Sequence, residues 1–331
     1  MKKAVFFMTD GLFDIVFHKD DIKYLQQYVE LALPSYNSKN FLENLDKFKD
    51  VNFLFSSWGV PKLDKDLLEA MPSLEAVFYA AGSVRHFVTD CFWEKDIALT
   101  TASMANAIPV AEFTFAQIIC CLKRQFYFMN RVKRQRDFSV DRDDIAGSYK
   151  SKVGIISLGN ISKRVIDLLK HTSVDIMLYC ITADDCIAKE LGVELASIEE
   201  IFMQADVVSL HTAANEQTRG MIRGHHFESM KPGASFVNTA RGMIVEQEQM
   251  IEVLKRRSDL TAVLDVTTPE PPLKDSVLYD MENVILTPHI AGSAGHECRR
   301  MGRYMIDELV RYIDNEPLKW RVKKEDLSYL A

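Results

Sequence analysis

The feature that most constrains the fold is the run Lys152–Ser162, which passes from an apolar, β-branched stretch through a glycine into a helical pattern. We expect a strand, a tight turn and a helix, with Val165, Ile166, Leu168 and Leu169 on one face of the helix. The first N–H groups of such a helix lack partners within it and lie just past the strand end, where a pyrophosphate can bind. The run therefore predicts the beginning of a dinucleotide site.

The glycine fingerprint of such turns, G-x-G-x-x-G, is only partly kept. Ser157 and Ser162 stand at its first and third positions, and Gly159 remains at the second. A strand, turn and helix with one glycine is common in any α/β protein. An ordinary α/β unit therefore remains the alternative to a cofactor site at this point.

Length and composition limit the classes of function. A chain of 331 residues exceeds what one core usually supports, so we expect two domains. The net charge of −7 argues against a nucleic-acid or membrane partner and favours small metabolites. The first apolar run, residues 4–8, is too short for a signal peptide, and we expect no run of transmembrane length. These two observations predict a cytoplasmic protein. The six cysteines show no C-x-x-C spacing, so we expect reduced thiols and no metal site.

Short apolar runs alternate with amphipathic stretches in the first hundred residues. Residues 4–8, 51–55, 76–80 and 97–101 are predicted strands, which indicates a parallel sheet with helices on its faces. Turn residues follow two of these strands directly, at 58–61 and 81–83. They are either ligand loops, which α/β proteins place there, or ordinary connections.

A long apolar helix is predicted next, with Asn106 as its cap, Pro109 in its first turn and an apolar body from Val110 to Met129. Being apolar nearly all round, it should be buried between domains or subunits. Cations gather at its end, where we favour a solvated surface that complements the helix dipole over a nucleic-acid patch. They are Lys123, Arg124, Arg131, Lys133, Arg134 and Arg136.

The rest of the chain fits a doubly wound nucleotide domain. Ser197 and Glu200 form an S-x-x-E capping box. A last helix at 297–312 is expected to return to the first domain. We therefore predict an α/β protein with two doubly wound parallel sheets, a Rossmann domain at 104–293 inserted into a flavodoxin-like domain formed by 1–103 and 294–331. Strands after the first are expected at 174–181, 206–211, 234–238, 261–266 and 284–287.

Three polar side chains follow three of these strands: Arg241, Glu270 and His289. Since the carboxyl ends of parallel strands meet at one edge, the three can converge there. An arginine offers a planar fork of donors for a carboxylate, and a histidine can give or take a proton near neutrality. A glutamate bonded to the far imidazole nitrogen fixes the tautomer and favours the protonated ring. The set describes reduction of a 2-keto acid: Arg241 anchors the carboxylate and polarises the carbonyl, His289 protonates the oxygen as a nicotinamide delivers hydride, and Glu270 supports His289.

Taken singly, each of the three has an ordinary structural alternative, but their local sequences together resemble a known family. The segments 237–242, 264–271 and 287–292 are similar, in order and spacing, to the three signatures of the D-isomer-specific 2-hydroxyacid dehydrogenases. The resemblance covers roughly residues 50–315. It implies two α/β domains, a nicotinamide cofactor and a homodimer across the long helix.

The resemblance also assigns residues. It gives Arg241, Glu270 and His289 the catalytic roles argued above, makes Asp265 a partner of the nicotinamide carboxamide, and lets the backbone at Gly82 and Ser83 meet the substrate carboxylate. We expect Arg241 to bind substrate as well. The expected cofactor contacts are Gly159, Asn160, Ile161, Cys180, Thr212, Thr218, Ala240, Asp265 and Gly292.

The chain departs from the family pattern beyond the two fingerprint serines. Cys180 stands where the family commonly has an aspartate for the adenosine ribose, and Ala213 replaces a usual proline. Residues 181–185 contain two carboxylates and no lysine or arginine, so NAD is favoured over NADP. The expected function is a 2-keto-acid reductase of the glyoxylate or hydroxypyruvate type. The alternative is a dinucleotide-sensing binding protein, similar to corepressors with this fold, that has little turnover.

Overall fold

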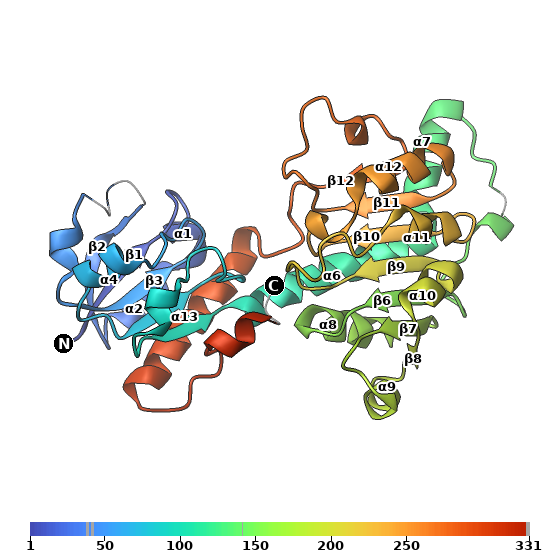
Figure 1. Ribbon diagram of the computed structural model, residues 1–331. Coiled ribbons are helices and arrows are strands. Elements are labelled where there is room, and N and C mark those ends of the chain that lie inside the picture. The colour runs from blue at the N-terminus through green and yellow to red at the C-terminus, as the bar shows by residue number, and fades with distance from the viewer. Residues whose placement is uncertain (38–39, 41–42, 141, 329–331) are drawn as a thin grey trace. The chain divides into compact units, whose positions relative to one another are not determined.

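The computed structural model describes residues 1–37, 40, 43–140 and 142–328, and the chain divides into two compact units. Unit 1 consists of Met1–Ala107 with Ser293–Ala331, and unit 2 of Ile108–Gly292. The chain therefore leaves unit 1, completes unit 2 and returns (Figure 1). Each unit has its own parallel sheet with helices, which confirms the predicted α/β class.

Unit 1 is built on a five-stranded parallel sheet in the order β2-β1-β3-β4-β5, the flavodoxin-like order. The edge strand β2, whose range contains a proline, was not predicted from the sequence. A proline donates no ladder hydrogen bond, so it weakens a strand prediction, and edge strands tolerate it. The strands are β1 (Lys3–Phe7), β2 (Glu30–Tyr36), β3 (Val51–Ser56), β4 (Ala76–Tyr79) and β5 (Ala98–Thr101).

Both faces of this sheet are covered. Alternate residues of β1 enter opposite clusters, Phe6 on the side of α13 (Cys298–Ile313) and Phe7 on the side of α4 (Lys65–Ala70). Helix α13 approaches so closely that a Cβ on Gly302 would lie 2.2 Å from the carbonyl oxygen of Val16. The other helical segments of unit 1 are α1 (Phe13–Val16), α2 (Lys19–Leu25), η1 (Leu45–Phe48), α5 (Asp90–Trp93), η5 (Gly295–Glu297) and η6 (Lys324–Ser328).

Unit 2 is built on a seven-stranded parallel sheet in the order β12-β11-β10-β9-β6-β7-β8. The order reverses between β6 and β9, as in a dinucleotide-binding Rossmann sheet. Strand β8 was not predicted from the sequence, because it has only two residues and therefore carries no periodic pattern. The strands are β6 (Lys152–Ile156), β7 (Asp175–Tyr179), β8 (Glu194–Leu195), β9 (Val207–Leu210), β10 (Ser235–Asn238), β11 (Thr261–Leu264) and β12 (Val284–Leu286).

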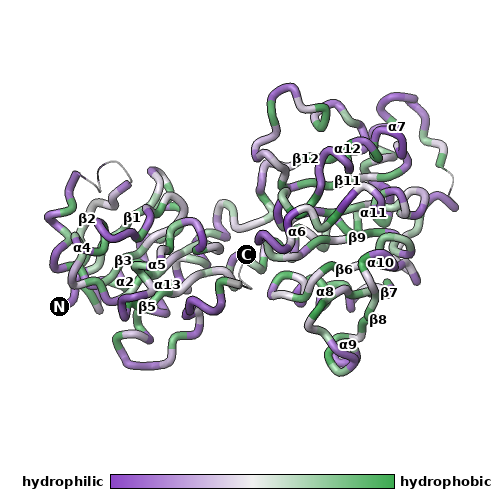
Figure 2. The backbone as a smooth tube through the Cα atoms, viewed as in Figure 1, coloured by the Kyte–Doolittle hydropathy of each residue, from purple (hydrophilic) through white to green (hydrophobic). Residues whose placement is uncertain are grey.

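Helices cover both faces of this sheet as well. Helices α6 (Ser103–Leu122) and α8 (Asn160–Leu169) pack on one face, and α10 (Ile198–Gln204), α11 (Gly224–Ser229) and α12 (Gln247–Arg256) on the other. The predicted capping box forms at α10, where Ser197 and Glu200 exchange hydrogen bonds. In Figure 2 the central strands are mainly green and α7 (Gln125–Gln135) mainly purple. The remaining segments are α9 (Asp185–Leu191), η2 (Arg142–Asp144), η3 (Gly242–Ile244) and η4 (Val277–Tyr279).

The prediction of one long helix capped by Asn106 is wrong. Helix α6 begins at Ser103, whose N–H bonds to Thr101 Oγ1 at 3.2 Å, and Asn106 lies inside it. The helix stops at Leu122, because Arg124 adopts a left-handed φ of 49°, and α7 follows. The side chain of Asn106 instead accepts the N–H of Ser293 at 2.8 Å, a contact within unit 1.

Helix α6 also corrects the expectation that no run reaches transmembrane length. By length and composition alone its 20 residues would suffice to cross a membrane. Half of that segment is buried inside the structure, where Ala111, Ile118 and Cys121 join the core cluster that contains Val153 of β6. A core helix of this kind has the same length and composition as a membrane span.

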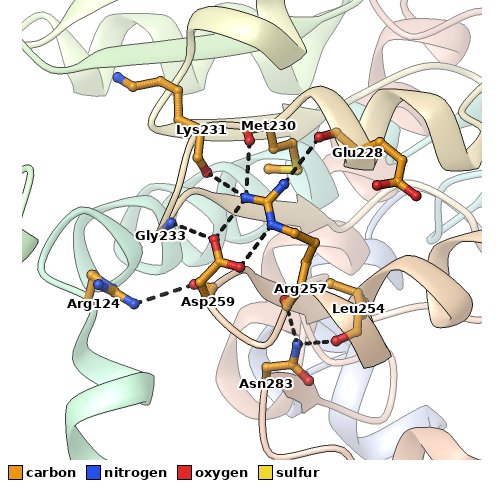
Figure 3. A network of polar contacts seen from close by, with 9 residues as sticks. All are labelled: Arg124, Glu228, Met230, Lys231, Gly233, Leu254, Arg257, Asp259 and Asn283. Atoms are coloured by element: carbon orange, nitrogen blue, oxygen red, sulfur yellow. Dashed lines mark hydrogen bonds and ion pairs between the residues drawn. The ribbon is translucent and has the colours of Figure 1, made fainter.

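The break between α6 and α7 is held by a polar network (Figure 3). Arg124 donates to the carbonyl oxygen of Asp259 at 3.4 Å. The Asp259 carboxylate receives two hydrogen bonds from Arg257, at 2.9 and 2.8 Å, and one from the N–H of Gly233 at 3.1 Å. Because only 12% of the Arg124 side chain is exposed, the prediction that it is a solvated surface cation is wrong.

Candidate active site

His289 and Glu270 meet in unit 2. His289 follows β12, and its Nδ1 lies 2.5 Å from Oε1 of Glu270, which lies in the loop after β11. The backbone at His289 has a left-handed φ of 54°, and its N–H bonds to the carbonyl oxygens of Asp265 and Thr287. Both side chains remain partly exposed, at 44% and 41%. The pair is therefore a rigidly held imidazole and carboxylate that a small molecule can reach.

The loop that carries His289 is fixed by the buried carboxylate of Asp265. Its Oδ1 accepts the Thr287 hydroxyl at 2.6 Å and the N–H of Ile290 at 2.9 Å, and its Oδ2 accepts the N–H of Ala291 at 2.9 Å. A cofactor contact was predicted for Asp265 from the sequence, but this structural role was not. Its position directly after a buried strand was the signal, because a carboxylate there can cap the neighbouring loop.

Arg241 stands just after β10. Asn238 holds this turn by donating to the Arg241 carbonyl at 3.2 Å and by accepting the N–H of Ala240 at 3.0 Å. Burial is the larger effect and lowers the pKa of Arg241 below its ordinary value, while the charge of Glu270 acts in the opposite direction, so the guanidinium lies within electrostatic reach of that carboxylate. Arginine remains protonated in proteins, so the site holds a fixed cation.

The glycine after Arg241 is required by a close approach of two loops. A Cβ on Gly242 would lie 2.1 Å from the backbone carbon of Thr267. Any larger residue would push the loop of Arg241 away from the loop that leads to Glu270. Arg241, Glu270 and His289, together with Ala240 and Asp265, thus follow the adjacent strands β10, β11 and β12 at one sheet edge.

The expected phosphate turn lies at the end of β6. Ser157, at the first fingerprint position, adopts a φ of 79°, which normally favours glycine. Ser162, at the third position, is buried, and its hydroxyl accepts the N–H of Gly159 at 2.7 Å and donates to the Gly159 carbonyl at 3.2 Å. The first intrahelical bond of α8 comes from Lys163, so the amides of Asn160 and Ile161 precede it and are free of the helix ladder.

A buried hydroxyl group without a partner in the described part of the chain lies beside this turn, at Thr212. It follows β9, the strand next to β6 at the order reversal, and His211 bonds through its N–H to the Ile156 carbonyl at 3.0 Å. Thr212 Oγ1 is buried and has no partner among the described residues. A buried hydroxyl without a partner is costly, and a polar group of a bound cofactor would satisfy it.

The polar groups near Thr212 are already engaged. His211 Nε2 lies 2.9 Å from Ser209 Oγ, and burial lowers the pKa of His211 to about 4. The Thr218 hydroxyl donates to the Ala213 carbonyl at 2.7 Å and accepts the N–H of Asn215 at 3.0 Å, which closes the loop after β9. A cofactor contact at Thr218 stays a prediction, as does one at Gly292, the last residue of unit 2.

The described residues contain no group of His, Cys, Asp or Glu side chains suited to a metal ion.

Cys180 follows β7, beside the phosphate turn. Burial raises the pKa of its thiol, but hydrogen bonds from Thr182 and from the backbone at Leu158 and Ala183 outweigh this and lower it below the ordinary value. Asp184, one of the two nearby carboxylates, caps α9 by accepting the N–H of Ile187 at 2.9 Å.

Gly82 and Ser83, the expected substrate contacts, belong to unit 1 and follow β4.

Comparison with known proteins decides the family. Residues 115–291 match the model described as D-isomer specific 2-hydroxyacid dehydrogenase, NAD binding domain. The chain belongs to the D-isomer-specific 2-hydroxyacid dehydrogenase family. This confirms the resemblance of the three signatures, and it makes unit 2 the part that corresponds to the NAD-binding domain of the family.

Relatives in this family differ in length and name. The chain is 31% identical over 274 residues to the glyoxylate reductase of Korarchaeum cryptofilum, covering 81% of each protein. It is 30% identical over 302 residues to the D-3-phosphoglycerate dehydrogenase of Methanocaldococcus jannaschii, covering 90% of this chain and 56% of that protein. The chain thus spans about half the length of the phosphoglycerate dehydrogenases that it matches, the one from Archaeoglobus fulgidus included, of which it covers 49%.

Solved structures of this family share the fold over nearly the whole chain. The apo D-mandelate dehydrogenase of Rhodotorula graminis aligns with a TM-score of 0.81 at 24% identity, covering 98% of both chains. The NAD-complexed 2-hydroxyacid dehydrogenase of Lactobacillus delbrueckii aligns with a TM-score of 0.80 at 19% identity, covering 97% of this chain and 100% of that chain. At these identities the similarity establishes the fold alone.

Proposed function

We propose that the chain reduces a small 2-keto acid to the D-2-hydroxy acid with NADH. The hydrogen bond of 2.5 Å between His289 and Glu270, with Arg241 in electrostatic reach of the same carboxylate, is the observation that carries this proposal. A protein that only senses a dinucleotide has no need of a proton donor, an orienting carboxylate and a fixed cation on three adjacent loops.

Each residue has one task in the reaction. Arg241 holds the substrate carboxylate and polarises the carbonyl, because its planar fork of donors suits two oxygens. His289 gives the proton from Nε2 to the carbonyl oxygen. Glu270 accepts a hydrogen bond from the Nδ1–H of His289 and thereby fixes the tautomer and orientation of the ring. The amides of Gly82 and Ser83 in unit 1 are the second proposed site for the carboxylate.

The cofactor contacts are part of this proposal. A bound nicotinamide dinucleotide supplies the hydride. The amides of Asn160 and Ile161 would bind its pyrophosphate at the N-terminus of α8, where the helix dipole favours an anion. Gly159 keeps this approach open, since a Cβ built there meets nothing within 4 Å. The remaining predicted contacts are Cys180, Thr212, Thr218, Ala240, Asp265 and Gly292.

A steady-state assay with NADH and a panel of glyoxylate, hydroxypyruvate, pyruvate and bulkier keto acids tests the function. We expect turnover with at least one member and near loss of it in His289→Asn, with NADH binding retained. Tight NADH binding without turnover of any keto acid by the parent would favour the dinucleotide-sensing alternative. Loss of NADH binding in His289→Asn would make that residue structural.

We also infer a cytoplasmic homodimer. Helix α7 has no buried residue of its own. Large apolar side chains are exposed on this helix and on the segment that follows it, namely Met129, Phe138, Val140 and Tyr149. Large apolar side chains that are exposed in a single chain can become buried against a partner. Light scattering at micromolar concentration tests this: a monomeric mass would contradict it, and Phe138→Asp should weaken the dimer.

A further inference from the structure

The loop after β4 in unit 1 has four successive carbonyl groups engaged by side chains. Ser57 Oγ donates to Ala80 O at 2.9 Å. The single hydroxyl of Thr101 faces both Ala81 O, at 2.7 Å, and Gly82 O, at 2.8 Å. The next carbonyl, that of Ser83, bonds with the ring of His86. Both hydroxyl groups are buried, at 0% and 3% residue exposure for Ser57 and Thr101.

This arrangement fixes the direction of the amides. In a trans peptide the C=O and the N–H of one unit point in opposite directions. Because Ala81 O and Gly82 O both point to Thr101, the N–H groups of Gly82 and Ser83 both point away from it. These two N–H groups have no acceptor within the part of the chain that the structure describes. Two unpaired amides that point the same way in a partly exposed loop can bind an anion.

We propose that Thr101, assisted by Ser57, is the positioning residue for a carboxylate-binding pair of amides at Gly82 and Ser83. The inference rests on the proposed function and deepens it. Gly82 and Ser83 carry no cationic side chain, so it is their backbone amides that bind the keto-acid carboxylate. Thr101 also accepts the N–H of Ser103, so the same hydroxyl joins the loop to the start of α6. The amides are thereby held before the ligand arrives, which avoids the cost of ordering them on binding.

Thr101→Val tests this, because valine keeps the shape and removes the hydroxyl. Without the shared donor the two carbonyls turn toward other partners and the amide pair loses its alignment. We expect KM for the best keto acid of the panel to rise about tenfold, with NADH affinity unchanged and kcat changed much less. Thr101→Ser keeps the hydroxyl and should restore KM. Ser57→Ala, which releases only the Ala80 carbonyl, should raise KM about threefold.

Thr100→Val is the matched control. Thr100 is the neighbouring buried threonine of β5, and its hydroxyl faces Met305 Sδ at 3.4 Å instead of the loop. It should leave KM at the parent value. Binding of oxamate, a keto-acid analogue that is not reduced, measured by calorimetry in the presence of NADH, should weaken in Thr101→Val in parallel with KM.

The outcomes separate the two proposals. A parent enzyme without turnover refutes the proposed function, and a parent that also fails to bind oxamate refutes the carboxylate site. A parent with turnover and a folded Thr101→Val with unchanged KM overturns the inference alone. If Thr101→Val does not fold, Ser57→Ala decides: an unchanged KM overturns the inference and a raised KM supports it. A rise of KM in Thr100→Val equal to that in Thr101→Val would show a general effect of β5 and would also overturn it.

Discussion

His289 Nδ1 and Glu270 Oε1 lie 2.5 Å apart although they belong to loops after two different strands, β12 and β11. The contact is made because Asp265 holds the backbone from Thr287 to Ala291 with three hydrogen bonds. The ring is therefore oriented by one carboxylate while its loop is held by another.

Glu270→Gln should lower kcat for keto-acid reduction by about tenfold. The neutral amide is a weaker acceptor for the Nδ1–H of His289, so the ring loses the partner that orients it. Steady-state kinetics at one fixed pH measure this. Glu282→Gln, which removes the carboxylate of a surface ion pair with Arg134, is the control and should leave kcat unchanged. An unchanged kcat in Glu270→Gln would make the glutamate a bystander.

Arg241→Lys should keep the fold and lose about one to three orders of magnitude in kcat/KM. The ammonium keeps the charge but not the planar fork that binds two oxygens. Arg256→Lys makes the same change at an exposed ion pair with Glu228 and should have no effect. An unchanged kcat/KM in Arg241→Lys would remove this residue from the site.

Thr212→Val should change stability and cofactor affinity in opposite directions. Removing a buried hydroxyl that has no partner should raise the free energy of unfolding of the cofactor-free protein by about 1 kcal/mol, whereas NADH should bind about tenfold more weakly. Urea unfolding and calorimetry measure the two effects. Thr172→Val is the control, because its hydroxyl already bonds to the Leu169 carbonyl at 2.6 Å: it should lower stability and leave NADH binding alone. Unchanged NADH affinity in Thr212→Val would assign its hydroxyl to another partner.

The parent protein should bind NADH more tightly than NADPH, and the difference in affinity should be modest. Cys180 offers no carboxylate to the ribose hydroxyls, and Asp184 and Asp185 repel a 2′-phosphate. Cys180→Asp should tighten NADH, and Cys180→Arg should recover some binding of NADPH. Calorimetric titration with both dinucleotides tests this. Tighter NADPH binding by the parent would require a basic group from a distant part of the chain.

Stability should fall as the pH drops below neutrality, in part through His211. Its pKa of about 4 in the folded protein lies below the ordinary value of 6.5, so the unfolded chain binds the proton first. The loss begins near pH 6.5 and continues toward pH 4. At pH 5 it amounts to roughly 2 kcal/mol relative to pH 7. His211→Gln removes this titration, so urea unfolding at pH 5 and pH 7 should differ less than in the parent. An equal difference would contradict the assignment.

Much of the fold could be predicted from the sequence because most strands are apolar runs bounded by turn residues. β2 and β8 lack that signal, one through a proline in its range and the other through its length. The end of α6 was also missed, because a left-handed Arg124 is held by the distant carbonyl of Asp259, which no local pattern records.

The residues of the candidate site also include some that could be predicted from the sequence and some that could not. Arg241, Glu270 and His289 could be predicted because each follows a strand and because polar side chains there converge. The groups that hold them were missed, since Asp265 and Asn238 act through hydrogen bonds to loops that only the fold brings near. From the sequence, Ser162 was interpreted as a missing glycine of the fingerprint. In the structure, its hydroxyl bonds to both the N–H and the carbonyl of Gly159.

The return of the chain to unit 1 at Ser293 sets the order in which a nascent protein can be completed on the ribosome. The strands of unit 1 emerge first, but the sheet face that contains Phe6 and Phe78 waits for Met305 of α13, which follows all of residues 108–292. At about 5–20 residues per second, that interval lasts roughly 10 to 40 s. The aromatic face is exposed throughout this time, whereas both core clusters of unit 2 lie within residues 108–292 and can form as soon as those residues are made. The nascent chain should therefore be prone to aggregation through this face until α13 is complete.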